Sequence, residues 1–299
     1  MSEPSSSTAG VHVLRLDPSL YKLGDEEASF FKQTTGIKDG EKLRQHILEV
    51  QKEAYAVYPY PCIGRFGFTT LRISRHPIYD DLLRLGKERS GILLDVGCCF
   101  GNDARKAVAD GYPVNKVIAS DLEPAFWQLG HRLFKSTPES FPVPFIAGDA
   151  FDPAFLEPSL PIYSSPSTPP PDLSRVTTLT ELRGQVSAIH ASALFHLFDE
   201  EKQLALARSL ASLLAPHPGA MIFGSHGAAQ EKRVQVWSPT PDSEQLTMFC
   251  HSPESWRGMW ESILGADKVM VETALQEVTR GSGPEARPWY WLAWSVKRL

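Results

Sequence analysis

An apolar run that ends in a glycine turn, LLDVGCCFGND (93–103), constrains the fold of this chain more than any other segment. The run has the character of a buried strand, and Gly97 and Gly101 follow it with G-x-x-x-G spacing. Glycine allows a tight turn and the close approach of a ligand, because no Cβ stands in the way. A helix predicted to begin near Asn102 would offer free backbone N–H groups to an anionic group of that ligand. The segment therefore predicts a strand, a ligand-binding turn and a helix in succession.

Two further acidic residues follow predicted strands. Asp121 ends VIASD (117–121), where its carboxylate can accept hydrogen bonds from both hydroxyls of a ribose. Asp149 ends the next predicted strand, PFIAGD (144–149), where it can meet the exocyclic amine of adenine. Successive strand ends would thus present ligand groups along one edge of a sheet, as expected at a topological switch point. This arrangement predicts a nucleoside site, and the alternative is a tight turn without a ligand.

A dinucleotide cofactor is the main rival for this site. NAD-binding turns usually carry G-x-G-x-x-G, whereas the position two residues after Gly97 is Cys99, whose side chain obstructs the approach of a pyrophosphate. A sulfonium amino-acid cofactor has no phosphate and fits this turn better. Cys98 and Cys99 have no basic neighbour in the sequence that would activate a thiol, so we expect packed side chains rather than nucleophiles.

Short apolar runs with strand character alternate with helical patterns from residue 91 onward. Such alternation predicts a parallel sheet covered by helices on both faces. Two late strand candidates, at 268–278 and 289–299, would close the sheet as an antiparallel pair. We therefore predict an α/β, Rossmann-like fold with a seven-stranded, mostly parallel sheet and a terminal antiparallel strand.

The chain divides into three predicted parts. Residues 1–10 are small and polar, so we expect a disordered tail. Residues 11–90 are predicted to form a helical lid or cap, because apolar residues recur at helical spacing over 25–58. Residues 91–299 form the predicted catalytic domain, which a Pro- and Ser-rich insertion interrupts at 157–175.

Charge and cysteine spacing exclude several classes of protein. The formal net charge of -5 gives no general attraction for a polyanion, so we expect no nucleic-acid partner. No run approaches the roughly 18 apolar residues that span a bilayer, and the start MSEPSSSTAG lacks the regions of a secretory signal. We therefore expect a cytoplasmic protein without a membrane partner. The four cysteines lack the paired spacing of a zinc site, and we expect no metal.

Together these motifs resemble the class I S-adenosylmethionine methyltransferases over about residues 90–299. VGCCFGND, with YPYPCIGRFGF upstream and SAIHASALFHLFDEE downstream, looks like the fungal natural-product methyltransferases of polyketide and meroterpenoid pathways. The resemblance implies S-adenosylmethionine as the cofactor, with its amino-acid end near Asp95, its ribose near Asp121 and its adenine near Asp149. The implied cofactor contacts are Asp95, Gly97, Cys98, Cys99, Phe100, Gly101, Asp103, Asp121, Leu122, Asp149, Ala150, Phe151 and Ser192.

The loop departs from the family pattern at Cys98, Cys99 and Phe100, which stand where small residues such as Gly and Ser are common. We expect the backbone atoms of these residues to serve in place of their side chains.

The predicted acceptor site lies where the fourth strand ends, in AIHASALFHLF. Histidine as a residue type titrates near neutral pH, so His190 or His196 is predicted to take a proton from a phenol or hydroxyl as its oxygen attacks the methyl carbon. The alternatives are that His190 is a packed residue or a cofactor contact and that His196 sits on a helix face. Orientation and desolvation can also suffice, and a carboxylic acid needs no base. Tyr58, Tyr60 and Trp237, expected in loops, are predicted to line an apolar acceptor pocket.

The sequence thus predicts an S-adenosylmethionine-dependent O-methyltransferase that acts on a small aromatic or polyketide-type secondary metabolite, at a phenol hydroxyl or a carboxylate. A protein or RNA methyltransferase is the alternative enzyme, although the acidic balance and the lack of an Asn/Asp-Pro-Pro-Tyr/Phe motif count against it. A non-catalytic methyltransferase-like binding protein is the third alternative, and the intact acidic strand ends count against that. The sequence does not fix the oligomeric state.

Overall fold

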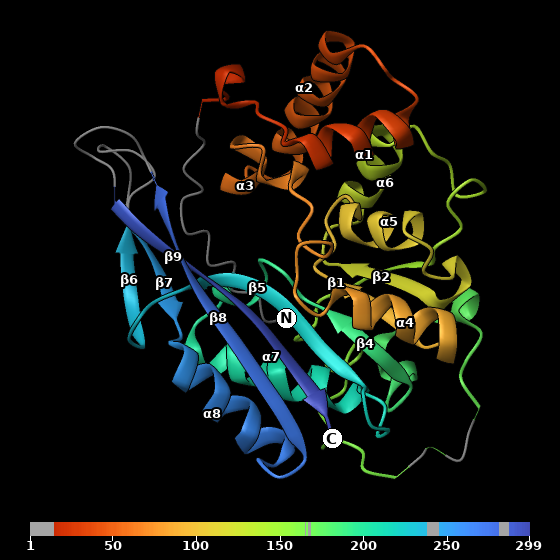
Figure 1. Cartoon of the computed structure of the whole chain (residues 1–299), viewed down its shortest axis with the longest axis vertical. Coiled ribbons are helices and arrows are strands. Elements are labelled where there is room, and N and C mark those ends of the chain that lie inside the picture. Colours follow the sequence, from red (N-terminus) through yellow and green to blue (C-terminus); the bar gives the residue numbers. More distant parts are fainter. Residues whose placement is uncertain (1–14, 165, 167–168, 238–244, 281–286) are drawn as a thin grey trace, which may run out of the picture.

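A seven-stranded sheet flanked by helices forms the centre of the protein (Figure 1). The computed structural model describes residues 15–164, 166, 169–237, 245–280 and 287–299. The tail predicted at 1–10 lies outside the described residues. In the described part of the chain, no helix has both the length and the apolar character needed to cross a bilayer.

The strand order across the sheet is β3 (Phe145–Ala147), β2 (Val117–Asp121), β1 (Ile92–Val96), β4 (Val186–His190), β5 (Met221–Ala228), β9 (Arg287–Arg298) and β8 (Val269–Arg280). The first five strands pair in parallel. β9 is antiparallel to both β5 and β8, so it runs against the other strands. This arrangement confirms the predicted fold class. The order reverses between β1 and β4, which is the switch point at which such sheets bind ligands.

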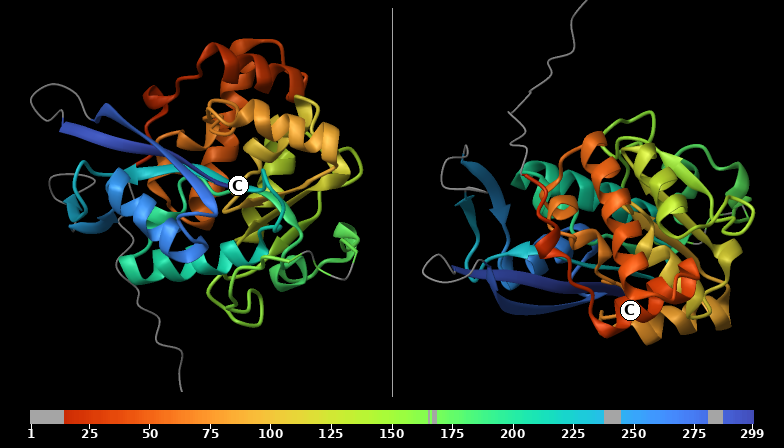
Figure 2. Two further views of the ribbon diagram at one scale, coloured as in Figure 1. Left: turned by 60° about the horizontal axis from the view of Figure 1, so that its bottom comes forward. Right: turned by 90° about the horizontal axis from the view of Figure 1, so that it is seen from above.

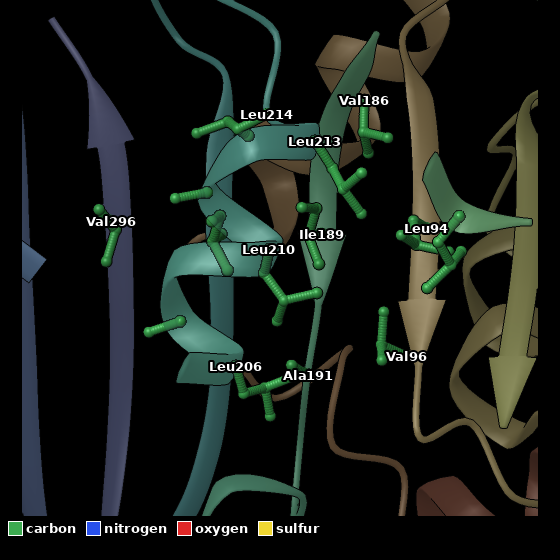
Figure 3. Close-up of a cluster of buried hydrophobic side chains, with 14 of the residues drawn as sticks. Leu94, Val96, Val186, Ile189, Ala191, Leu206, Leu210, Leu213, Leu214 and Val296 are labelled. Atoms are coloured by element: carbon green, nitrogen blue, oxygen red, sulfur yellow. The ribbon is translucent and has the colours of Figure 1, made fainter. Parts of the chain in front are cut away.

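Helices cover both faces of the sheet, and they are α4 (Tyr79–Arg89), α5 (Asn102–Ala109), α6 (Pro124–Leu133), α7 (Glu200–Leu213) and α8 (Pro253–Leu264). Successive strand residues point to opposite sides, so each strand contributes to both faces. Leu93 and Ala188 pack towards α4, α5 and the start of α6. Leu94 and Ile189 point to the other face, where they meet the leucines of α7 (Figure 3). Burial on both faces explains why β1 is an almost continuous apolar run.

The single helical pattern predicted over 25–58 forms two helices, α1 (Asp25–Thr35) and α2 (Gly40–Val57). Gly36 adopts the left-handed conformation, with φ of 72°, and thereby ends α1. The side chain of Asp39 then caps α2. The uninterrupted prediction was wrong because the cap residues between the helices were overlooked.

The amino-terminal helices pack beside the glycine turn and α6. They lie together beside α6, with the short helix α3 (Pro61–Gly64) next to them (Figure 1). Their apolar residues form one cluster with Phe100 and Phe126, which belong to the glycine turn and to α6. The amino-terminal segment is therefore continuous with the core of the sheet domain through buried aromatic contacts.

A second, two-stranded sheet was absent from the prediction. It pairs β6 (Arg233–Trp237) with β7 (Leu246–Cys250) and lies with the β8–β9 pair at one end of the molecule (Figures 1 and 2). Trp237 is the last residue of β6, so its prediction as a loop residue was wrong. Its side chain lies outside the described residues. The alternating sequence RVQVW was the signal that indicated a strand.

Part of the predicted insertion at 157–175 contacts the core. Leu160 is 84% exposed. However, the hydroxyl of Tyr163 donates to the carbonyl oxygen of Leu264 at 2.9 Å, and the carbonyl oxygen of Ile162 accepts from Arg298 at 2.8 Å. These contacts fix the described portion of the segment against the end of α8 and the end of β9.

Two glycines within helices provide a matched test of packing. A Cβ at Gly130 in α6 would lie 2.3 Å from the carbonyl oxygen of Phe100, whereas a Cβ at Gly258 in α8 would meet nothing within 4 Å. We expect Gly130→Ala to lower the free energy of unfolding by about 1–3 kcal/mol through overpacking. Gly258→Ala should raise it by up to about 1 kcal/mol through helix propensity. Denaturant unfolding measures both, and equal effects would show that α6 is not held against the glycine turn.

His76 should make stability depend on pH. It is buried, its Nε2–H donates to the carbonyl oxygen of Trp294 at 3.1 Å, and its Nδ1 accepts the N–H of Ile78 at 3.3 Å. Burial, with the nearby charge of His190, lowers the pKa of His76 to about 4. Below about pH 6.5 the unfolded chain therefore binds a proton that the folded protein does not bind. As the pH is lowered from there towards about pH 4, the free energy of unfolding falls.

The expected contribution is up to about 1.4 kcal/mol per pH unit. His76→Gln should remove this part of the slope when the free energy of unfolding is measured across that range. An identical slope in the wild type and the variant would refute the assignment.

Candidate active site

The glycine turn after β1 combines three left-handed residues, Gly97 (φ 68°), Cys99 (φ 51°) and Gly101 (φ 69°). The N–H groups of Gly97 and Cys98 donate to the carbonyl oxygen of Ser120 at 2.8 and 3.2 Å, which ties the turn to β2. Gly101 precedes α5 and provides no side-chain cap. The first N–H groups of α5 therefore receive no hydrogen bond from a capping side chain.

Asp121 lies at the end of β2 and holds the glycine turn. Its Oδ2 accepts the N–H of Cys99 at 2.8 Å, and its Oδ1 accepts the N–H of Glu123 at 3.1 Å. Burial raises the pKa of Asp121, although these backbone hydrogen bonds oppose the shift. Each carboxylate oxygen has a second lone pair for a ligand. The neighbouring Leu122 is 63% exposed, which leaves an apolar surface beside the carboxylate.

The prediction that Asp149 ends a strand was wrong. β3 stops at Ala147, and Asp149 lies in the turn that follows, where its Oδ1 accepts the N–H of Phe151 at 2.9 Å. The strand is short because Gly148 and the Asx turn at Asp149 break the extended run. The ring of Phe151 packs edge-on against Phe198 at 4.8 Å between centroids. The three residues 149–151 still lie at the edge of the sheet beside the end of β2.

The unusual residues of the turn point inward. Cys98 is 9% exposed and Phe100 1% exposed, and the ring of Phe100 packs between Phe68 and Phe126 at 4.9 and 5.8 Å. Burial raises the pKa of Cys98 and of Cys99 well above its ordinary value. The thiols are therefore poor nucleophiles, and the backbone of this turn is what remains for a ligand.

The start of α5 holds the chain that follows α3. The side-chain amide of Asn102 donates to the carbonyl oxygen of Phe68. Asp103 Oδ1 accepts the N–H groups of Arg72 and Ile73 at 2.8 and 2.9 Å. Asp103 was predicted to contact the cofactor, but one of its oxygens fixes the amino-terminal segment to the site.

Two tyrosines of this segment lie side by side next to α6. The rings of Tyr58 and Tyr60 are 4.3 Å apart, and Tyr60 reaches Phe126 of α6 at 5.9 Å. Burial and the neighbouring charges of Tyr58 and Asp121 raise the pKa of Tyr60 to about 12. The structure therefore brings Tyr60 near the carboxylate predicted to hold the ribose. It does not describe the side chain of Trp237, the third predicted pocket residue.

A hydrogen-bonded row of three side chains crosses from β1 to β4 and beyond. Asp95 Oδ1 and His190 Nδ1 are 2.8 Å apart, and His190 Nε2 and Ser192 Oγ are also 2.8 Å apart. Asp95 and His190 are each 2% exposed, whereas Ser192 is half-buried. The two nitrogens of His190 are thus both engaged. This pairing was missed from the sequence, although Asp95 and His190 stand in register on neighbouring strands.

His196 lies after β4 in a separate group. Its Nδ1 accepts the N–H of Gly227 at 3.4 Å, and its ring meets Trp291 of β9 edge-on at 5.8 Å. The guanidinium of Arg72 lies 4.5 Å from the centroid of the same tryptophan. Sequence reasoning missed Arg72 and Trp291, because no local pattern relates residues so far apart. Among the described residues, no three histidine, cysteine or acidic side chains gather as a metal site would require.

Comparisons with known proteins complete this description. The sequence model of the meroterpenoid methyltransferase N-terminal domain matches residues 16–69. Among solved structures, the chain is similar to 1,6-didemethyltoxoflavin-N1-methyltransferase of Burkholderia thailandensis, with a TM-score of 0.46, 14% identity and coverage of 84% of this chain and 87% of that one. The O-methyltransferase phiE of a fungal species is 28% identical, over 80% of this chain and 71% of that protein.

The methyltransferase ausD of Penicillium brasilianum is 30% identical over 223 residues, which cover 75% of this chain and 71% of that protein. The methyltransferase trt5 of Aspergillus terreus is likewise 30% identical, over 75% and 71%. Identity of this degree over most of both sequences makes the protein a member of the fungal natural-product methyltransferases, which are S-adenosylmethionine-dependent enzymes.

Proposed function

We propose that this protein transfers a methyl group from S-adenosylmethionine to an oxygen atom of a small aromatic or polyketide-type secondary metabolite, at a phenol hydroxyl or a carboxylate. Two relatives, phiE and atr3 of Stereocaulon alpinum, are named O-methyltransferases, which supports oxygen as the acceptor atom. The match to a meroterpenoid methyltransferase domain supports a natural product as the acceptor. We expect the reaction to take place in the cytoplasm, without a nucleic-acid partner and without a metal.

The groups at the glycine turn fit the amino-acid end of this cofactor. Asp95 Oδ2 is buried and accepts no hydrogen bond from the described residues, so it is suited to receive an ammonium group. The uncapped N–H groups of α5 are suited to a carboxylate. When bound, the cofactor supplies an electrophilic methyl group on its sulfonium sulfur. Gly97 and Gly101 adopt positive φ in this turn, and the side chains of Leu194 and Trp127 fill the space that a Cβ would take there.

The ribose and adenine assignments rest on the end of β2 and on the turn that follows β3. Asp121 is proposed to accept hydrogen bonds from the ribose hydroxyls through its remaining lone pairs. The exposed side chain of Leu122 is suited to one face of the adenine, and burial of that surface would favour binding. Asp149, with the backbone of Ala150 and Phe151, is proposed to meet the edge of the base.

The amino-terminal segment is proposed to act as a lid over the cofactor and as one wall of the acceptor pocket. Asp103 and Asn102 hold this segment to α5, and Tyr60 approaches Asp121. Such a cover excludes water around the reacting groups and orients the acceptor. Tyr58, Tyr60 and Trp237 remain the proposed pocket residues.

Proton removal matters only for some acceptors. A carboxylic acid is already ionised at neutral pH, whereas a phenol, with a pKa near about 10, gains from a base. His196 and His190 are the two proposed bases, and a base acts most simply by direct contact with the acceptor. His190 would have to break one of its two 2.8 Å contacts to act in this way.

Asp121→Ala should weaken S-adenosylmethionine binding by about 1.5–3 kcal/mol, because hydrogen bonds to a charged group are lost. Calorimetry measures the affinity, and Asp121→Asn should show a smaller loss because it keeps one acceptor oxygen. Asp267→Ala, at an exposed turn before β8, serves as the control. Unchanged affinity in Asp121→Ala would show that the ribose lies elsewhere.

Labelled S-adenosylmethionine and two matched acceptors test the proposed reaction. Methyl gallate offers only phenol groups, and trimethoxybenzoic acid offers only a carboxyl group. If the phenol is methylated and His196 is its base, His196→Gln should lower kcat by about 100- to 10,000-fold, with activity partly recovered at high pH as the phenol ionises in solution. Normal kcat in this variant would leave His190 as the proposed base. If only the acid is methylated, the variant should keep its activity. Transfer to nitrogen or carbon acceptors alone would refute O-methylation.

A further inference from the structure

We propose that Ser192 is the residue that takes the proton from a phenolic acceptor and passes it to His190, with Asp95 holding the imidazole. This inference rests on the proposed O-methyltransferase function and deepens it. Ser192 was predicted only as a cofactor contact, and His190 as a base in direct contact with the acceptor. The geometry points instead to a relay in which Ser192 touches the acceptor and His190 acts through it.

The hydrogen-bond directions in the row favour such a relay. An ionised carboxylate can only accept, so His190 Nδ1–H donates to Asp95 Oδ1 at 2.8 Å. In the neutral imidazole, Nε2 is then an acceptor, and it receives the hydroxyl proton of Ser192 at 2.8 Å. Ser192 Oγ also accepts the N–H of Ser225 at 3.1 Å. One lone pair remains on this oxygen, which can accept the hydroxyl proton of an acceptor.

Ser192 and His190 differ in solvent exposure. His190 is 2% exposed and has partners on both nitrogens, so an acceptor cannot reach it while the row is intact. Ser192 is half-buried, beyond the end of β4, at the sheet edge where the glycine turn also lies. The hydroxyl is therefore the member of the row that an incoming molecule can meet.

The charges around His190 favour the arrival of a proton. Asp95 on β1 and Asp103 on α5 face it with negative charge, while Arg72 and His76 approach from the segment before α4. Burial by itself would lower the pKa of His190. The hydrogen bond and charge of Asp95, aided by Asp103, outweigh burial and Arg72, and the pKa of His190 is raised. The imidazolium that would form is thus stabilised where it stands.

A strained turn holds Ser192 in place. Ala193 adopts the left-handed conformation with φ of 55°, and its N–H donates to the carbonyl oxygen of Ser225 at 2.6 Å. A Cβ at Gly224 would lie 2.1 Å from the carbonyl oxygen of Ala191, so glycine is needed for the turn to rest on β5. Non-glycine residues in this conformation are costly and cluster at functional sites. This turn fixes the hydroxyl relative to His190.

The acceptor O–H bond breaks as its proton moves to Ser192 Oγ, and the original Ser192 O–H proton moves to His190 Nε2. The electron pair released on the acceptor oxygen forms the bond to the methyl carbon, and the pair of the sulfur–methyl bond stays on the sulfur. The positive charge of the sulfonium is thereby replaced by that of the imidazolium, which later loses its proton to water.

The first experiment observes His190 directly. In full-length protein carrying ¹⁵N-histidine, saturated with S-adenosylhomocysteine, NMR should show Nδ1 protonated and Nε2 unprotonated at the alkaline end of a titration from about pH 6 to pH 10. The relay requires this tautomer, because Nε2 must be free to take the proton. An Nε2 that keeps its proton throughout would overturn the proposal without bearing on whether the protein is a methyltransferase.

The second experiment compares variants in methyl transfer to methyl gallate. Ser192→Ala and His190→Gln should each lower kcat by about 100-fold or more at neutral pH, with part of the loss recovered at high pH. Ser192→Thr keeps the hydroxyl and should restore most of the rate. Ser187→Ala changes a buried serine at the other end of β4 and serves as the control. Calorimetry with S-adenosylhomocysteine and thermal unfolding verify that each variant is folded and binds.

The outcomes separate the relay from the proposed function. Active wild type with an equally active Ser192→Ala overturns the relay alone. A Ser192→Ala variant that loses cofactor affinity instead of kcat places the hydroxyl in the donor site and also overturns it. Transfer to trimethoxybenzoic acid but not to methyl gallate removes the need for a relay while leaving O-methylation intact. A wild type that binds the cofactor but methylates no oxygen acceptor overturns the proposed function and the relay with it.

Discussion

The buried carboxylate of Asp95 on β1 determines which residues must lie around it. Asp95 interrupts the otherwise apolar β1 and is 2% exposed. A buried charge without hydrogen-bonding partners is strongly unfavourable, so this position demands a donor. His190 supplies one from the adjacent strand, in register with Asp95. This hydrogen bond requires that β1 and β4 are neighbours and end at the same level, and that arrangement creates the switch point of the sheet.

The sequence predicted the parts of the fold that depend on local patterns. The strand, turn and helix around Gly97 and Gly101 were foreseen because apolar runs and glycine have local meanings, and the late antiparallel strands followed from their apolar character. The end of β3 was misplaced at Asp149, since an Asx turn and an extended strand look alike in a short run. The break at Gly36 and the pair β6–β7 were overlooked although their signals were present.

The site was less accessible to such reasoning, because its contacts join distant parts of the chain. Nothing local to Asp103 indicates that it accepts hydrogen bonds from Arg72 and Ile73, and nothing near Trp291 indicates that Arg72 lies over it. Residue types at strand ends could be identified, but not which of their atoms were already in use. For Asp95, Asp103 and His190, the hydrogen bonds already made decide which atoms are left to contact a ligand. Only the packing of the amino-terminal segment against the sheet shows which of these atoms already have hydrogen-bond partners.

The two oxygens of Asp95 have different surroundings, and this asymmetry couples two equilibria. Oδ1 meets His190, while Oδ2 is buried without a partner among the described residues. Any donor that fills Oδ2 draws negative charge away from the imidazole and lowers its affinity for a proton. By thermodynamic reciprocity, a proton on His190 weakens the hold of Asp95 on that donor to the same degree. Through this one carboxylate, ligand binding at the glycine turn and protonation of the histidine on the next strand can influence each other without any movement of the backbone.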